Sequence, residues 1–127
     1  MILLDTSVLV RYLRTHDAKI KAVFDSQRIA VSVVTRAEIL HGARDDQDFR
    51  RLTAALDGFV QVTVDDVAWA DLAVNLYKLR LRGTPVPFPD ALIATVAIQR
   101  GLELWTFDSD FTLMQAALPA LRLYPFP

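Results

Sequence analysis

The chain has 127 residues, 53% of them apolar and 23% charged, which fits one globular domain, residues 1–127, and excludes a disordered protein. It has no cysteine, which excludes disulfide scaffolds, thiolate zinc sites and cysteine nucleophiles. The net charge of −1 argues against nucleic-acid binding through overall positive charge, and it leaves open a local basic surface or an acidic pocket that holds cations.

The first part of the chain alternates short apolar segments with helical patterns. Ile2–Leu4 is wholly apolar and ends at Asp5, which predicts a short strand buried on both faces. Helical patterns follow at Ser7–Arg14 and Ala18–Phe24, and the short β-branched run Ile29–Val33 predicts a second strand.

Two helices and a strand are predicted next. The helix Thr35–Ala43 opens on Thr35 with Glu38 three residues later, which is the spacing of a capping box. A helix at Phe49–Leu56 and a strand of alternating polarity at Val60–Val64 follow.

The clearest helical periodicity covers Val67–Arg82, and Gly83 follows where a glycine cap is expected. The apolar stripe of this helix consists of Trp69, Leu72, Ala73, Leu76 and Leu79. The next segment, Gly83–Pro89, contains three prolines that alternate with other residues, which predicts an extended loop.

The helix predicted at Asp90–Arg100 is apolar nearly all round, so we expect it to be covered on two sides, and it also suits a contact between two copies of the chain. After it, Leu104–Phe107 predicts a strand that leads to Asp108, and a short helix and a strand at Leu121–Tyr124 complete the chain. Strands that alternate with helices predict the α/β class, with a mostly parallel sheet and helices on both faces.

Four acidic residues are predicted at one edge of this sheet. Asp5 and Asp108 follow strands, Glu38 lies in the first turn after a strand, and Asp90 opens a helix. Ligands of open α/β sheets bind beyond the carboxyl ends of the strands, so the four carboxylates converge if the strands before Asp5 and Asp108 are neighbours. Two carboxylates about 4 Å apart repel by roughly 4 kcal/mol at an effective dielectric of about 20. A hard cation such as Mg²⁺ or Mn²⁺ relieves this repulsion and, by activating water, favours phosphodiester hydrolysis.

Each acid taken alone also has a structural explanation. Asp5 is a candidate helix cap, and Glu38 completes the capping box. Asp90 complements a helix dipole, and Asp108 suits an Asx-turn, while Asp110 competes with Asp108 for any functional role. A shared function is favoured because independent capping needs give four acids no reason to lie at one edge.

No other motif indicates a competing chemistry. The chain lacks a glycine-rich phosphate loop and the Gly-x-Ser-x-Gly elbow of serine hydrolases. Glu38 and His41 have the Glu-x-x-His spacing of di-metal bundle sites, but the motif occurs only once. Arg11, Arg14 and Arg36 lie nearest to the acids in sequence and are candidate contacts to an RNA backbone, with solvated helix faces as the ordinary alternative.

Four segments that span nearly the whole chain carry a family resemblance. They are Ile2–Val10, Ser32–Gly42, Pro89–Thr95 and Leu104–Phe111. In this order they resemble the PIN-domain ribonucleases, specifically the VapC-type toxins of type II toxin–antitoxin pairs. The ordered set, more than any single segment, carries the resemblance, which implies a PIN-like three-layer fold.

The resemblance implies that Asp5, Glu38, Asp90 and Asp108 match the acidic quartet of the family. Asp5, Asp90 and Asp108 would then be metal ligands, and Glu38 would orient the attacking water or hold a second ion. The hydroxyl residues that match supporting positions are Thr6, Ser7 and Thr106. The resemblance also implies Mg²⁺-dependent cleavage of RNA, a homodimer, and a cognate antitoxin that lays a helix along an apolar groove and reaches toward the acids with a basic side chain.

Two further functions remain open from the sequence: a non-catalytic PIN-like module that binds RNA or a protein, and a small phosphatase on a similar sheet. The sequence predicts neither a leader nor a membrane span. Met1–Leu4 is a short apolar start, and the longest apolar stretch, Ala91–Ile98, falls far below the roughly 20 residues of a membrane helix. We therefore expect a cytoplasmic protein with no membrane partner.

Overall fold

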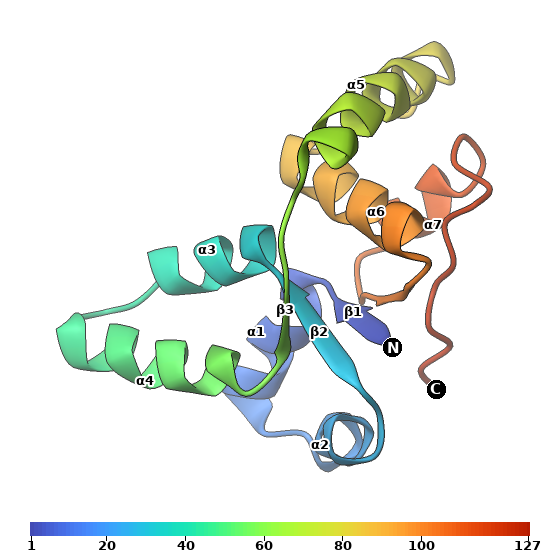
Figure 1. Cartoon of the computed structure of the whole chain (residues 1–127). Coiled ribbons are helices and arrows are strands. Elements are labelled where there is room, and N and C mark those ends of the chain that lie inside the picture. Colours follow the sequence, from blue (N-terminus) through green and yellow to red (C-terminus); the bar gives the residue numbers. More distant parts are fainter.

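The computed structural model describes all 127 residues and contains seven helices around a four-stranded sheet (Figure 1). The elements in chain order are β1 (Ile2–Leu4), α1 (Thr6–Thr15), α2 (Ala18–Ser26), β2 (Ile29–Ser32), α3 (Val33–His41), α4 (Asp46–Asp57), β3 (Val60–Val62), α5 (Asp66–Leu81), α6 (Phe88–Arg100), β4 (Glu103–Trp105) and α7 (Asp110–Met114). None of the helices combines the length and the apolarity needed to cross a lipid bilayer.

The sheet has the strand order β3-β2-β1-β4, and every neighbouring pair is parallel. The register pairs Leu3 of β1 with Ala30 of β2 and Leu104 of β4. This confirms the α/β class, and it makes neighbours of the two strands that lead to Asp5 and Asp108. The last predicted strand, at Leu121–Tyr124, is reduced to a single bridge between Leu123 and Leu104.

The core lies on both faces of the sheet, because side chains of a strand alternate between its faces. Leu3 belongs to one buried cluster, which includes residues of α5, α6 and α7. Ile2 and Leu4 belong to the other, which includes residues of α1, α2, α3 and α4. Figure 1 shows α5 and α6 on one side of the sheet and α1 and α4 on the other. A wholly apolar β1 therefore suits a strand covered on both faces.

Helix α3 begins two residues earlier than predicted, at Val33. Its N-cap is Ser32, whose side-chain oxygen accepts a hydrogen bond from the backbone N–H of Thr35 at 3.2 Å. The predicted capping box of Thr35 and Glu38 is therefore wrong, since Ser32 already satisfies that amide. Glu38 is left free to bond elsewhere, and it does so in the candidate site.

Helix α5 differs from its predicted stripe. Ala68, Leu72 and Leu79 are buried, whereas Trp69 is 47% exposed and Ala73 is exposed. A second apolar face is open to solvent, and it consists of Val67, Val74, Tyr77 and Leu81. The predicted cap at Gly83 is confirmed, because this glycine has a φ of 67° and the next amide, that of Thr84, donates to the carbonyl of Leu79 at 3.0 Å.

Helix α6 starts at Phe88, so the predicted extended loop ends two residues sooner than expected. Pro87 occupies the N-cap and Pro89 the first turn, where a missing amide costs no helical hydrogen bond. Seven consecutive residues, Ala91–Ala97, are buried, which confirms coverage from two sides. That apolar segment is therefore covered within the chain, while Phe88 at the start of the helix stays 53% exposed, so a contact between two copies through α6 remains a prediction only for its exposed end.

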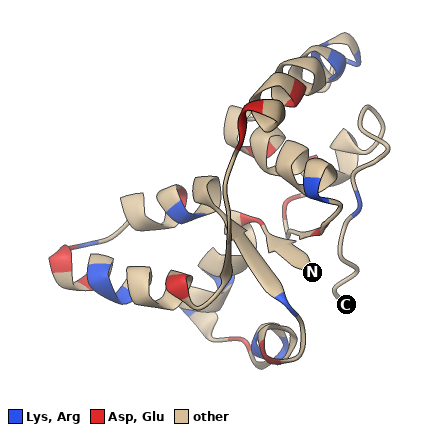
Figure 2. Ribbon diagram, viewed as in Figure 1, with Lys and Arg blue, Asp and Glu red and all other residues tan.

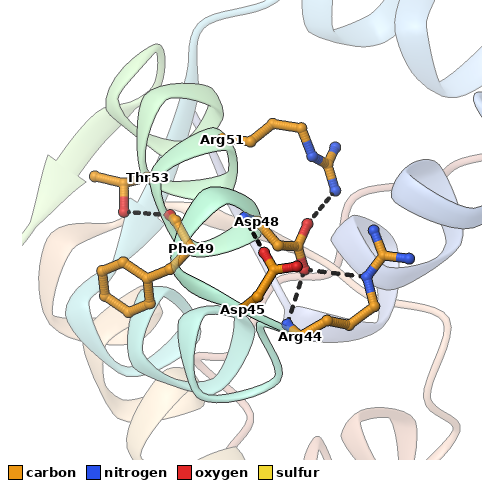
Figure 3. A network of polar contacts seen from close by, with 6 residues as sticks. All are labelled: Arg44, Asp45, Asp48, Phe49, Arg51 and Thr53. Atoms are coloured by element: carbon orange, nitrogen blue, oxygen red, sulfur yellow. Dashed lines mark hydrogen bonds and ion pairs between the residues drawn. The ribbon is translucent and has the colours of Figure 1, made fainter.

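A charged network fastens the start of α4 (Figure 3). Asp45 caps the helix through the amide of Asp48, and the buried Asp48 carboxylate accepts from Arg51 at 2.6 Å and from the backbone of Arg44 at 3.0 Å. The hydrogen bond from the Arg44 amide, followed by that from Arg51, lowers the pKa of Asp48 to about 2. The Asp48 carboxylate at the start of α4 therefore stays ionised and paired with Arg44 and Arg51 at neutral pH.

Candidate active site

Asp5 lies directly after β1 and is 4% exposed. One of its oxygens accepts hydrogen bonds from the hydroxyl of Ser7 at 2.6 Å, the hydroxyl of Thr106 at 2.8 Å and the amide of Ser7 at 3.3 Å. The last bond caps α1, so the structural explanation for Asp5 holds. The other oxygen accepts no hydrogen bond within the chain, which leaves this buried carboxylate free to bind an ion.

Glu38 comes from α3 and its side chain is exposed. It accepts a hydrogen bond from the hydroxyl of Thr6 at 2.9 Å, across 32 positions of the sequence. Beneath it, the hydroxyl of the buried Thr35 donates to the carbonyl of Leu4 at 3.4 Å. These bonds tie the start of α3 to the end of β1, and so hold Glu38 beside the segment that carries Asp5.

Asp108 follows β4 by three residues, and Thr106 connects it to Asp5. The Thr106 hydroxyl donates to Asp5, while its oxygen accepts from the amide of Asp108 at 2.9 Å. Asp108 in turn accepts from the amide of Asp110 at 2.9 Å, which is the bond of the predicted Asx-turn. Thr6, Ser7 and Thr106 therefore support the carboxylates, as the family resemblance implied.

Three carboxylates lie close enough to share one ion. Oxygens of Asp90, Asp108 and Asp110 all lie within 4.8 Å of one another, and all three residues are half-buried. From the sequence, Asp108 and Asp110 are alternative candidates for the fourth acid of the site. The turn at the start of α7 brings both of them beside Asp90. Apart from its spacing of two residues from Asp108, Asp110 is distinguished by no pattern in the sequence.

The pKa of Asp90 reflects how closely the acidic residues converge. Burial and, after it, the repulsion of neighbouring negative charges together raise the pKa of Asp90 from its ordinary 3.8 to about 6. These charges belong, in decreasing order of effect, to Asp5, Asp108, Glu38 and Asp110. Four carboxylates, from the end of β1, from α3 and from the segment after β4, thus all act on Asp90 at a single edge of the sheet.

No basic side chain neutralises this cluster. The ion pairs of the chain use Asp25, Asp48 and Asp57 as their acids, and none involves one of the five. Lysine and arginine are distributed over several elements with acidic residues between them (Figure 2). A site of five unpaired carboxylates offers only hard oxygen ligands, and these fit a Mg²⁺ or Mn²⁺ ion.

A separate apolar groove of about 300 Å³ lies among helices α1, α2, α3 and α4, which belong to the buried cluster that does not include α5 and α6. It is lined by Leu9, Tyr12, Leu13, Phe24, Asp25, Ile39, Leu52, Ala55, Leu56, Gly58 and Phe59. Nine of these eleven residues are apolar, so the groove suits an apolar segment better than a nucleic acid. The two histidines lie outside the acidic cluster, His16 after α1 and His41 at the end of α3.

Comparison with known proteins decides the family. The family model for the PIN domain matches residues 2–116. The chain belongs to the PIN domain family. VapC ribonuclease Mb1587 of Mycobacterium bovis is 33% identical to this PIN domain over 123 residues, which cover 90% of this chain and 91% of that protein. Ribonuclease VapC51 of Mycobacterium tuberculosis is 30% identical over 118 residues, which cover 90% and 85% respectively.

Solved structures agree with this family and with its VapC group. VapBC-5 of Mycobacterium tuberculosis, a member of the VapBC family of toxin–antitoxin systems, has 30% identity and a TM-score of 0.66, with 91% of this chain and 90% of that chain covered. DNA-bound VapBC of Salmonella typhimurium has a TM-score of 0.84 at 23% identity and covers 99% and 98%. The predicted resemblance to VapC-type PIN domains is confirmed, and so is the predicted fold.

Proposed function

We propose that this PIN domain is a Mg²⁺-dependent endoribonuclease and the toxin of a type II toxin–antitoxin pair that acts in the cytoplasm. The observation that carries the proposal is the cluster of five carboxylates without a basic partner, in a chain whose curated relatives are named ribonucleases. A structural role gives no reason to gather repelling charges, whereas a divalent cation does. A non-catalytic PIN-like module is the alternative.

Asp5, Asp90 and Asp108 would hold the ion. Asp110 lies with Asp90 and Asp108 in the group whose oxygens are within 4.8 Å of one another, whereas Asp5 lies outside that group. When bound, Mg²⁺ or Mn²⁺ lowers the pKa of water at the site and stabilises negative charge on a phosphodiester. The chain supplies the rigidity: Ser7 and Thr106 hold the Asp5 carboxylate in one orientation by two short hydrogen bonds.

Glu38 is the acid best suited to act on the water. It is exposed at the edge of the cluster, and Thr6 fixes its carboxylate by a single hydrogen bond, which leaves acceptor sites free. From there Glu38 accepts a hydrogen bond from the attacking water and takes its proton. Attack at phosphorus breaks one P–O bond of the RNA backbone, so that one fragment carries the new phosphate monoester and the other a hydroxyl group.

Cleavage that requires a divalent cation tests this proposal. The purified chain, freed of metal with a chelator, is mixed with structured cellular RNA and then with Mg²⁺ or Mn²⁺. We expect discrete RNA fragments only after the ion is added, and no phosphate release from an aryl phosphate, which a phosphatase would produce. RNA that stays intact with either ion, while the protein still binds it, would instead favour the non-catalytic module.

We also propose that the antitoxin binds in the apolar groove. The groove is open and is bounded by helices α1, α2, α3 and α4, and Asp5 caps the start of α1. A helical segment with an apolar face fills such a groove by burying side chains every three or four residues. From the α1 end of the groove, a basic side chain of the partner could then reach toward the carboxylates.

A substitution at Ala55 tests the groove. Ala55 lines the groove and is exposed on α4, and its neighbour Ala54 is also exposed but lies outside the groove. We expect Ala55→Arg to weaken antitoxin binding at least about tenfold by blocking the groove, with RNA cleavage by the free protein unchanged. Ala54→Arg is the matched control. Equal antitoxin affinity of the two variants, measured by calorimetry, would contradict this position for the partner.

For the homodimer we propose the exposed face of α5. Val67, Val74, Tyr77 and Leu81 form an apolar stripe on the side of the helix away from the core, and their exposure ranges from 51% to 62%. Trp69 of the same helix packs against Phe88, which is 53% exposed. Contiguous exposed apolar residues of this kind mark protein contacts. The mass in solution, measured by light scattering, tests the dimer.

A further inference from the structure

An open depression adjoins the acidic cluster on its α1 side. It is lined by Ser7, Val10, Arg11, Arg14, Thr15 and Phe107. Ser7 belongs to both places, because its hydroxyl donates to Asp5 and accepts from the amide of Phe107 at 3.0 Å. Phe107 also directly precedes Asp108. A ligand in this depression therefore lies next to any group held by the carboxylates.

Arg11 and Arg14 are free to bind a ligand there. Both are exposed, and neither forms an ion pair with a carboxylate of the chain. Arg36, the third arginine that the sequence singled out, is instead paired with Asp57 at 2.8 Å and donates to Gln61 at 3.2 Å. Two of the three sequence candidates thus remain available, and both line the same depression.

Phe107 holds the guanidinium of Arg11 in position. The Cζ atom of Arg11 lies 3.7 Å from the centre of the Phe107 ring, which is a close cation–π contact. The ring is itself packed against Trp105 at 6.2 Å and Phe126 at 5.7 Å between ring centres, and Trp105 is fully buried. A guanidinium held by its face keeps its N–H groups free at its edge, where they match two oxygens of a phosphate.

We infer that Arg11 and Arg14 bind an RNA backbone phosphate adjacent to the phosphodiester held at the carboxylates, with Phe107 as the positioning residue for Arg11. This inference rests on the proposed ribonuclease function. RNA approaches a cluster of five carboxylates in a chain of net charge −1, so cations beside the cluster must supply the attraction. Because phosphate contacts read no base, this subsite tolerates any sequence.

Binding of a labelled single-stranded RNA, measured by fluorescence anisotropy at several salt concentrations, tests the subsite. All proteins carry Asp90→Asn so that the RNA stays intact. We expect Arg11→Gln and Arg14→Gln each to weaken binding about tenfold, and to lower the salt dependence by about 0.7 in the log–log slope per lost contact. Arg50→Gln, at an exposed arginine of α4 outside any ion pair, is the matched control and should change affinity less than twofold.

The role of Phe107 has its own readout. Phe107→Leu should weaken binding as much as Arg11→Gln, and the two together should weaken it no further, because they remove one contact. Phe107→Tyr retains the ring and should restore the affinity. In steady-state cleavage assays, with Asp90 intact, Arg11→Gln and Arg14→Gln should each raise KM more than they lower kcat.

Two results overturn the inference. If the Asp90→Asn protein binds RNA and the three arginine variants bind it equally well, the subsite is wrong while the ribonuclease function stands. If the unsubstituted chain neither binds nor cuts any RNA, the proposed function fails and the subsite fails with it.

Discussion

Replacing Asp90 by asparagine should abolish RNA cleavage and, in the absence of metal, make the protein more stable. Loss of cleavage follows because Asp90 is the carboxylate on which the other four act. Removing a group that merely supports a metal ligand costs about 10- to 100-fold in affinity or activity, so removing a ligand should cost at least about 100-fold.

The gain in stability follows from the raised pKa of Asp90. A carboxyl whose pKa is about 6 when folded and 3.8 when unfolded resists ionisation in the folded state. Each pKa unit corresponds to about 1.4 kcal/mol, and because Asp90 is only half-buried, screening by solvent reduces the total to about 1 to 2 kcal/mol at pH 7.5. Asp90→Asn removes this cost, so its Tm should rise by a few degrees.

The pH dependence has a definite sign. Between pH 4 and 6 the folded parent binds more protons at Asp90 than the unfolded chain does, so its stability falls as the pH rises through this window. The advantage of Asp90→Asn should therefore be absent below about pH 4 and complete above about pH 6. Thermal melts of both proteins in chelator at pH 4, 5, 6 and 7.5 measure it. An asparagine variant less stable than the parent at every pH would contradict the picture of crowded, unpaired carboxylates.

Asp5→Ala should also abolish cleavage, but it should destabilise the protein. Asp5 is almost fully buried, it caps α1, and it accepts from the hydroxyls of Ser7 and Thr106. Without it the helix loses its cap and two inward hydroxyls lose their acceptor, at a cost of about 2 kcal/mol. The Tm in chelator should therefore fall by several degrees.

Asp5→Asn is the matched control for this prediction. Asparagine keeps one acceptor oxygen and is a good helix cap, so it should lose cleavage with a much smaller loss of stability than Asp5→Ala. Two acids of one cluster would then shift stability in opposite directions while both are needed for cleavage. An Asp5→Ala protein that melts at the parent's temperature would show that the cap and the two hydroxyl bonds contribute nothing.

The order of the elements could be predicted from the sequence because local signals agree with the fold. Ile2–Leu4 is uniformly apolar and becomes β1, one of the two interior strands, and Gly83 adopts the left-handed conformation that its position required. Boundaries were less predictable. Because of its β-branched residues, the predicted strand runs through Ser32 to Val33, yet the Ser32 hydroxyl caps α3 and the helix begins at Val33.

The faces of the helices could not be derived from periodicity alone. In α5 two apolar stripes compete, and only packing against α6 shows that Ala68 and Leu72 face inward while Trp69 stays half-exposed. In α6 every side is apolar, so the sequence could not tell coverage within the chain from contact with another copy. Tertiary packing, which no local pattern contains, decides both cases.

Asp5 and Asp108 could be predicted to converge from their places after two strands, and the strand order brings those strands together. Asp110 could not be ranked against Asp108, because the outcome depends on a turn closed by the amide of Asp110 onto Asp108 itself. Nor could Arg11 and Arg14 be separated from Arg36, since the partners of Arg36, Asp57 and Gln61, lie far from it in sequence.

Diffraction from crystals soaked in Mn²⁺, recorded where manganese scatters anomalously, shows whether the acidic cluster binds a divalent cation. We expect an anomalous peak among the carboxylates of Asp5, Asp90 and Asp108, with no peak at that position in crystals of the Asp90→Asn protein. Manganese bound only elsewhere on the surface, or a cluster that stays empty at millimolar Mn²⁺ above pH 7, would contradict it.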